Sequence, residues 1–232
     1  MYKLSLIAMC VFSLVGCSKE DGTFIQDPRE LIYDFSLDAE GWQGDFADYP
    51  EGEETFYQLD FGFSRLPSPL DTTQGSLKQT GSNHSDDLFM FVKRKLTGLT
   101  PNQIYQATFD IEIASNAANG SVGVGGSPGE GVYIKAGMTQ IEPLKELENS
   151  SGHYRMNIDK GNQATDGLDM VLIGNFANGT DENVYAFKTL SNTIPFEIQS
   201  DRNGEVWVII GTDSGFEAIT TIYYNKISIT LE

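Results

Sequence analysis

The sequence predicts an all-β protein, an antiparallel β-sandwich of the jelly-roll type with roughly a dozen strands and at most one short helix. Several segments alternate apolar and polar residues with a period of two, which is the pattern of a half-buried strand. Turn signals rich in Gly, Asn and Ser separate these segments, and the chain contains 24 Gly but only 8 Pro. A parallel α/β fold would require amphipathic helices between its strands, and the sequence shows no such pattern.

The clearest strand pattern covers residues 105–113, where Phe109 and Ile111 lie on the apolar side of the alternation. Residues 57–63 and 153–159 repeat the same period. Shorter apolar runs predict strands that are covered on both faces. These runs are residues 88–92, 132–134, 170–173, 206–210 and 227–231.

Three other segments are read from their turn and helix signals. Residues 143–149 are the one candidate helix, because Pro143 can occupy a first helical turn. Residues 201–205 are interpreted as a hairpin turn. The glycine-rich residues 120–131 lack the Lys of a phosphate loop and a following helix, which favours a tight loop over a nucleotide site.

The composition restricts the partners of this protein. Lys and Arg number 15 against 33 Asp and Glu, and the net charge of -18 argues against binding to nucleic acid or to an anionic lipid surface. Hydrophobic residues at 40% and aromatic residues at 11% are sufficient for a folded core. No interior linker or repeat is evident, so we expect one domain over residues 31–232 and a neutral or cationic partner.

The N-terminus has the features of a secretory signal. Residues 1–16 carry Lys3 and then an apolar run that is shorter than the roughly 20 residues of a membrane span. The run ends at Leu14-Val15-Gly16-Cys17, which resembles the bacterial lipobox. The resemblance implies that Cys17 is acylated and that residues 17–30 form a polar tether. The alternative is an ordinary signal peptide with an incidental cysteine.

The resemblance to lipoproteins extends past the cysteine. Ser18-Lys19-Glu20-Asp21 resembles the export signal of Bacteroidetes surface lipoproteins, which implies an outer-membrane location and leaves open whether the outer face is occupied. Acyl chains at about 0.8 kcal/mol per buried methylene would hold the protein on the membrane. Because Cys10 leaves with the signal, the mature chain has no thiol for a disulfide or a thiolate metal site.

Three segments together resemble the jelly-roll carbohydrate-binding modules of the galactose-binding-like type. They are Tyr33–Phe35 with Ala39–Trp42, Leu96–Asn102 with Tyr105, and Ile222–Ile229. The resemblance implies a β-sandwich that binds a glycan, with a structural calcium where the first and last strands meet. Asp34 is the implied calcium ligand, but Asn225 stands where a closing Asp is expected, so calcium stays open.

Candidate ligand-binding residues are polar side chains in predicted loops, because planar polar groups read sugar hydroxyls while an aromatic ring packs on the pyranose. Tyr49 is the aromatic residue expected at the surface, and Trp42 and Trp207 are expected in the core. The alternative to a ligand-binding role is that these are ordinary solvated loop residues that cap backbone groups. Lys135 would then be a solvated strand residue. The candidates are Tyr49, His84, Asp86, Asp87, Glu130, Lys135, Asp159, Asn162 and Gln163.

The sequence signals for an enzyme are weaker. Residues 133–137 with Gln140 resemble a segment of jelly-roll alginate lyases, but the companion motifs are not present. A lyase or hydrolase would need His84, Tyr133 and Lys135 to converge in one cleft. The sequence has only 2 His, which excludes a His-rich zinc site.

The leading hypothesis is therefore a lipid-anchored, non-catalytic module that binds a neutral glycan. A structural or adhesive lipoprotein that binds another protein is the competing hypothesis, and a broad exposed apolar patch would favour it. A polysaccharide lyase or hydrolase is the third. The oligomeric state is left open.

Overall fold

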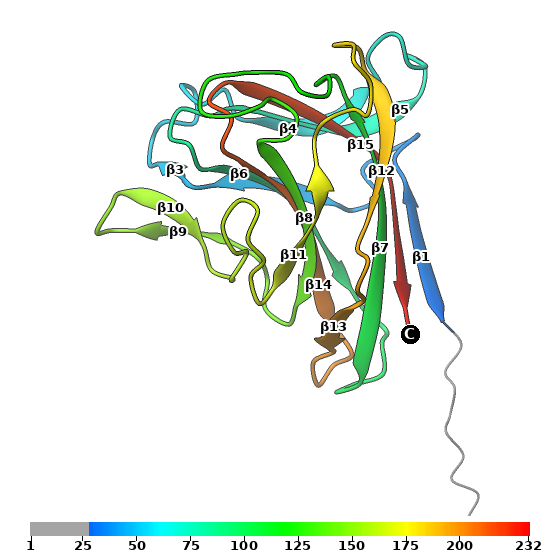
Figure 1. The fold of residues 1–232 in the computed structure, drawn as a ribbon. Coiled ribbons are helices and arrows are strands. Elements are labelled where there is room, and N and C mark those ends of the chain that lie inside the picture. The colour runs from blue at the N-terminus through cyan, green and yellow to red at the C-terminus, as the bar shows by residue number, and fades with distance from the viewer. Residues whose placement is uncertain (1–27) are drawn as a thin grey trace, which may run out of the picture.

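The computed structural model describes residues 28–232, and the predicted signal peptide and Cys17 lie outside them. Within the described residues the chain forms fifteen β-strands and no helix, which confirms the predicted all-β, antiparallel sandwich. Two large sheets pack face to face, and a small third sheet stands outside them (Figure 1). None of the described residues forms a helix that could cross a membrane.

The first sheet contains seven strands and holds both ends of the described chain. Its order is β12-β7-β15-β5-β4, with β1 beside β15 and β13 beside β7. Arg29 at the start of β1 is paired with Leu231 near the C-terminus, so the two ends lie side by side (Figure 1). The strands are β1 (Arg29–Asp34), β4 (Asp60–Arg65), β5 (Gly75–Ser82), β7 (Ile104–Ser115), β12 (Ala186–Ser191), β13 (Phe196–Gln199) and β15 (Ile219–Leu231).

The second sheet contains five strands in the order β11-β8-β14-β6-β2. Its central strand β14 is paired with β6 and β8 along its whole length, as the continuous apolar run at residues 206–210 predicts. The strands are β2 (Gln43–Ala47), β6 (Leu88–Leu96), β8 (Val132–Thr139), β11 (Met170–Asn175) and β14 (Val206–Ser214).

The main core lies between the two large sheets, and side-chain alternation along each strand decides which residues enter it. Trp42 is buried there, as predicted. The prediction for Trp207 was wrong, because its neighbours Val206 and Val208 face the core and turn Trp207 to the outer face of the second sheet. There it is half-buried, with the Nζ atom of Lys93 5.4 Å from its ring centroid.

A smaller apolar cluster covers the outer face of the second sheet. It joins the odd-numbered residues of β6 and β14 to the segment that follows β10. This cluster seats residues 157–169 on the sheet. Its members are Ala47, Phe89, Phe91, Ile158, Met170 and Ile209.

The third sheet corrects the helix prediction at residues 143–149. Lys145–Glu148 form the strand β9, which pairs with β10 (His153–Met156), and β10 pairs with β3 (Tyr49–Pro50). Gly152, with φ of 68°, closes the β9–β10 hairpin. Cross-strand pairing therefore outweighs the weak helical signal of Pro143.

Two further predictions are wrong in detail. The strand predicted at residues 57–63 begins at Asp60, because Tyr57 belongs to a turn in which its N–H donates to the carbonyl of Glu53. Residues 201–205 form a turn, in which Asp201 N–H donates to Glu205 O at 3.0 Å. That turn is no hairpin, because it connects β13 of the first sheet to β14 of the second.

Candidate functional site

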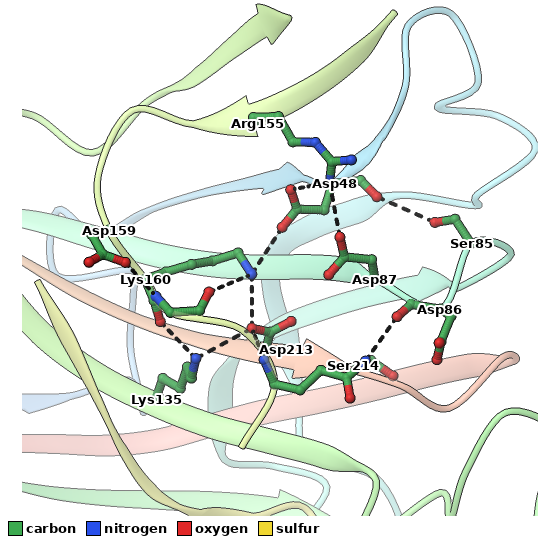
Figure 2. A network of polar contacts seen from close by, with 12 residues as sticks. Asp48, Ser85, Asp86, Asp87, Lys135, Arg155, Asp159, Lys160, Asp213 and Ser214 are labelled. Carbon is green, nitrogen blue, oxygen red and sulfur yellow. Dashed lines mark hydrogen bonds and ion pairs between the residues drawn. The ribbon is translucent and has the colours of Figure 1, made fainter. Parts of the chain in front are cut away.

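A network of ion pairs lies on the outer face of the second sheet, where five separate parts of the chain meet (Figure 2). Three acidic and three basic side chains take part, so their formal charges balance. They come from the segment after β2, the residue before β6, strands β8 and β14, and the segment from β10 to β11. The six residues are Asp48, Asp87, Lys135, Arg155, Lys160 and Asp213.

The base of the network is built on two neighbouring strands. Asp213 on β14 and Lys135 on β8 point to the outer face, and both are 0% exposed. Lys135 Nζ lies 3.5 Å from Asp213 Oδ2 and also donates to the carbonyls of Lys160 at 2.7 Å and Thr165 at 2.8 Å. The interpretation of Lys135 as a solvated strand residue is therefore wrong, because residues 160–165 cover it.

Lys160 is the centre of the network. Its Nζ lies 2.8 Å from Asp213 Oδ2 and 3.1 Å from Asp48 Oδ2. Burial opposes the charge of Lys160, but the two carboxylates outweigh burial and raise its pKa. Burial lowers the pKa of Lys135, which lies beneath. The ammonium groups thus tie residues 160–165 to the sheet.

Arg155 connects the network to the surface. Its Nη1 donates to Asp48 Oδ1 at 2.8 Å and to Asp87 Oδ2 at 2.9 Å. Burial and the neighbouring Asp48 carboxylate raise the pKa of Asp87 above its ordinary value, and the hydrogen bond from Arg155 opposes this only partly.

A shallow depression of about 250 Å³ opens above these ion pairs. Asp87, Asp159 and Asn162, which the sequence predicted as ligand-binding residues, all line it. Asp86 and Gln163 lie next to it, where Gln163 Nε2 donates to the carbonyl of Asp86 at 3.1 Å. The structure thus brings two predicted loops together. The remaining lining residues are Asp48, Arg155, Met156, Ile158, Lys160 and Gly161.

An exposed aromatic pair joins two loops, because His84 lies between β5 and β6, in the loop that leads to Asp87, and Phe56 lies between β3 and β4. His84 is exposed and stacks on Phe56, with ring centroids 4.1 Å apart, and Phe56 is 57% exposed. The loop of His84 is attached to the network by Ser85, whose hydroxyl donates to the carbonyl of Asp48 at 3.4 Å. Phe56 therefore offers an exposed apolar ring next to His84.

Two predicted ligand-binding residues lie elsewhere. Tyr49 was expected at the surface, but it is fully buried, because its ring packs against Tyr57 and Tyr154. The hydroxyl of Tyr49 accepts a hydrogen bond from Lys145 at 2.7 Å. Glu130 braces the glycine-rich loop instead of the depression, and its carboxylate accepts a hydrogen bond from Gly120 N–H at 2.8 Å.

The residues implied for calcium do not fit the ion. Calcium takes about six to eight oxygen ligands, whereas Asp34 accepts a hydrogen bond from Ser36 N–H at 2.8 Å and lies opposite Lys226 in the strand register. The Asn225 side chain is engaged by Gln74, which donates to its Oδ1 at 2.7 Å. Within residues 28–232 no three His, Cys, Asp or Glu side chains are grouped as a metal site.

Two residues of the lyase hypothesis, His84 and Lys135, lie in different environments. The ammonium group of Lys135 is enclosed by two backbone carbonyls and Asp213, whereas His84 is exposed and stacked on Phe56. Neither side chain is placed to move a proton on a substrate that the other contacts.

Several residues of the site were missed by sequence reasoning. Asp48, Arg155 and Asp213 were not predicted, and neither was the apolar platform of Phe56. Asp213 carried a usable signal, because an acidic residue three positions after the apolar run 206–210, in a buried strand, requires a cationic partner. Asp48 and Arg155 carried none, because their pairing depends on how β2 and β10 approach each other.

Comparisons with known proteins give low similarities. No protein-family model matches the chain, and no curated protein matches its sequence. A Stig cyclase from Fischerella sp. TAU is 12% identical with a TM-score of 0.42, and the match covers 85% of this chain and 88% of that one. The Clostridium thermocellum endo-1,4-β-D-xylanase 10B modules complexed with xylohexaose are 10% identical with a TM-score of 0.41.

The matched share differs between these structures. The xylanase match covers 88% of this chain but only 28% of the xylanase structure. The enzymatically active domain of bacteriophage CBA120 tailspike protein 4 is 10% identical with a TM-score of 0.34, over 81% of this chain and 19% of that one. At these TM-scores none of the similarities assigns a function to this chain.

Proposed function

We propose that this protein is a lipid-anchored cell-envelope protein whose depression binds a neutral glycan without catalysis. One observation carries the proposal: Asp87, Arg155 and Asn162 present polar groups around the depression, and the loop that leads to Asp87 carries His84, which stacks on the exposed ring of Phe56. Sugar recognition uses this combination, because polar groups read the hydroxyls while a ring covers the apolar face of the pyranose.

The ion pairs prepare the depression for binding. Both ion pairs of Arg155 use Nη1, which leaves its Nη2 and Nε without a protein partner among the described residues. Lys160 and Lys135 hold the segment that carries Asn162 in place. A rigid site loses less conformational freedom on binding, so weak contacts to hydroxyls contribute more of their energy to affinity.

A neutral glycan fits the charges better than an acidic one. The chain carries a net charge of -18, and Asp87 and Asp159 line the depression. The two cations at the depression, Arg155 and Lys160, are both already paired with carboxylates. A polyuronate would therefore meet net repulsion.

Glycan affinity is expected to fall about tenfold in the Asn162→Ala variant and about tenfold in the separate Phe56→Ala variant. Each variant loses one contact worth about 1.4 kcal/mol. Asn119→Ala and Phe187→Ala, also at exposed positions, are the matched controls and should bind as the parent does. The measurement is affinity electrophoresis of a Cys17→Ser form through neutral and acidic polysaccharides, with calcium and then with chelator. We expect a neutral polysaccharide to retard the protein both with calcium and after chelation. If no neutral polysaccharide retards it, the proposal is refuted.

The lipid anchor is the second part of the proposal, and the lipobox-like residues ending at Cys17 support it. Cys17→Ser is expected to move the protein from the outer-membrane fraction to the soluble fraction, because no acyl chain is then attached. Protease treatment of intact cells tests whether Ser18–Asp21 directs the parent protein to the outer face. A Cys17→Ser protein that stays in the membrane fraction would contradict the anchor.

A further inference from the structure

A second cavity has a lining that shares no residue with the depression of the candidate site. It is a groove of about 370 Å³, and its walls come from residues 166–172 on one side and residues 192–197 on the other. Two aliphatic side chains at its rim are unusually exposed, Leu168 at 85% and Ile194 at 78%. Such a grouping of exposed apolar residues is the feature that indicates a protein-binding surface.

The groove forms where the two large sheets part. β11 is an edge strand of the second sheet, and β12 and β13 lie at the edge of the first sheet. The apolar lining comes from both edges. It consists of Leu168, Val171, Leu172, Ile194, Pro195 and Phe196.

The one side-chain amide in the groove, that of Asn192, is already engaged. The Asn192 amide donates to the carbonyls of Ala107 and Ile194 and accepts from Phe109 N–H. The only aromatic ring of the lining, Phe196, is buried. A sugar would therefore find neither free hydrogen-bonding groups from Asn192 nor an exposed ring.

Addition of a β-strand to the edge of β11 is obstructed as well. Leu172 N–H donates to Asp166 Oδ1 at 2.7 Å, and the carbonyl of Met170 accepts from Gly167 N–H at 2.9 Å. With these backbone groups used, the groove can recognise a partner only through side chains.

We infer that this groove binds a segment of a partner protein that carries aliphatic side chains flanked by Lys or Arg. Two carboxylates, Asp166 and Glu197, line the groove, and no Lys or Arg does. A basic, apolar segment matches both the charge and the lining. The segment 159–169 contributes to both the groove and the glycan site, but no residue lines both, and the two ligand classes differ.

The test uses a short fluorescein-labelled peptide of alternating Lys and Leu, with Lys–Ser and Glu–Leu peptides as comparisons, and measures fluorescence anisotropy. We expect the Lys–Leu peptide to bind most tightly. Leu168→Ser combined with Ile194→Ser should weaken it about tenfold, because each side chain buries apolar surface. Glu197→Gln should weaken binding of the Lys–Leu peptide, because one carboxylate is lost. It should not weaken binding of the Glu–Leu peptide.

Leu37→Ser combined with Val122→Ser is the matched control, since both residues are exposed apolar side chains outside the groove. It should leave peptide binding unchanged. An equal loss in this control, or equal binding of all three peptides, would overturn the inference. Polysaccharide binding should survive the Leu168→Ser and Ile194→Ser changes, so failure of the groove and failure of the glycan proposal are distinguishable. Loss of polysaccharide binding would instead assign the groove to the glycan and overturn the inference.

Discussion

Replacement of Lys160 by Met is expected to lower the free energy of unfolding by about 3–5 kcal/mol, because it leaves buried carboxylates without their cation. Asp213 is 0% exposed and Asp48 is 5% exposed at the side chain. Asp48 keeps Arg155 as a cationic partner, whereas the one cation left to Asp213 is Lys135 at 3.5 Å, beside the hydrogen bond that Gln163 N–H donates at 2.8 Å. Removal of one partner from a buried pair is costly since the remaining charge stays desolvated.

Urea unfolding at neutral pH measures this loss. Lys78→Met is the matched control, because Lys78 pairs with the exposed Asp60 at 2.9 Å and should cost about 1 kcal/mol or less. The pKa of Lys160 is raised above the ordinary 10.5, so its stabilising charge is fully present below that value and is lost only as the pH rises past the folded-state pKa. If Lys160→Met and Lys78→Met lower the free energy of unfolding equally, Lys160 does not neutralise buried carboxylates as described.

Gly137→Ala is expected to lower the free energy of unfolding by about 1–3 kcal/mol or more, because the added methyl group has no room. A Cβ atom there would overlap the Asp169 carbonyl oxygen and would lie 2.7 Å from the Cα atom of Met170. Both neighbours are backbone atoms. Asp169 N–H is in turn bonded to the carbonyl of Asp159 at 3.0 Å, so the loop cannot move aside without losing that contact.

Gly62→Ala on β4 is the matched control, since no heavy atom lies within 4 Å of its Cβ position. It should be neutral or stabilise the protein by about 0.5–1 kcal/mol, as Ala is less flexible than Gly in a strand. Urea unfolding of both variants is the measurement. If Gly137→Ala unfolds like Gly62→Ala, residues 159–169 do not pack on β8 as described.

These two changes act on the same segment. Residues 159–169 carry Asn162 of the depression and Leu168 of the groove, and Lys160 and Gly137 hold the segment against the sheet. Both variants should therefore weaken polysaccharide binding and peptide binding together, unlike the substitutions within each site.

The strands with the clearest alternation were predictable because their signal is local. Residues 105–113 lie within β7, and the apolar runs at 88–92 and 206–210 lie within β6 and β14. The exceptions, β9 and the outward-facing Trp207, depend on pairing and on which face a strand presents. Neither is encoded within the segment itself.

The candidate site was predictable in part. Asp87, Asp159 and Asn162 were recognised as polar loop residues and do line the depression. Tyr49 and Glu130 were placed there by residue type alone, and the structure buries the first and assigns the second to another loop. Lipidation of Cys17 and the outer-membrane location stay predictions.

The sequence by itself determined the all-β class, the positions of most strands and the polar character of the loops, because periodicity and turn chemistry depend on neighbouring residues. Only the tertiary structure decided that Asp48, Lys160 and Asp213 meet, and that Leu168 and Ile194 flank one groove. Those encounters join distant parts of the chain. They follow from the order and register of strands in two sheets, which a pattern within one segment does not specify.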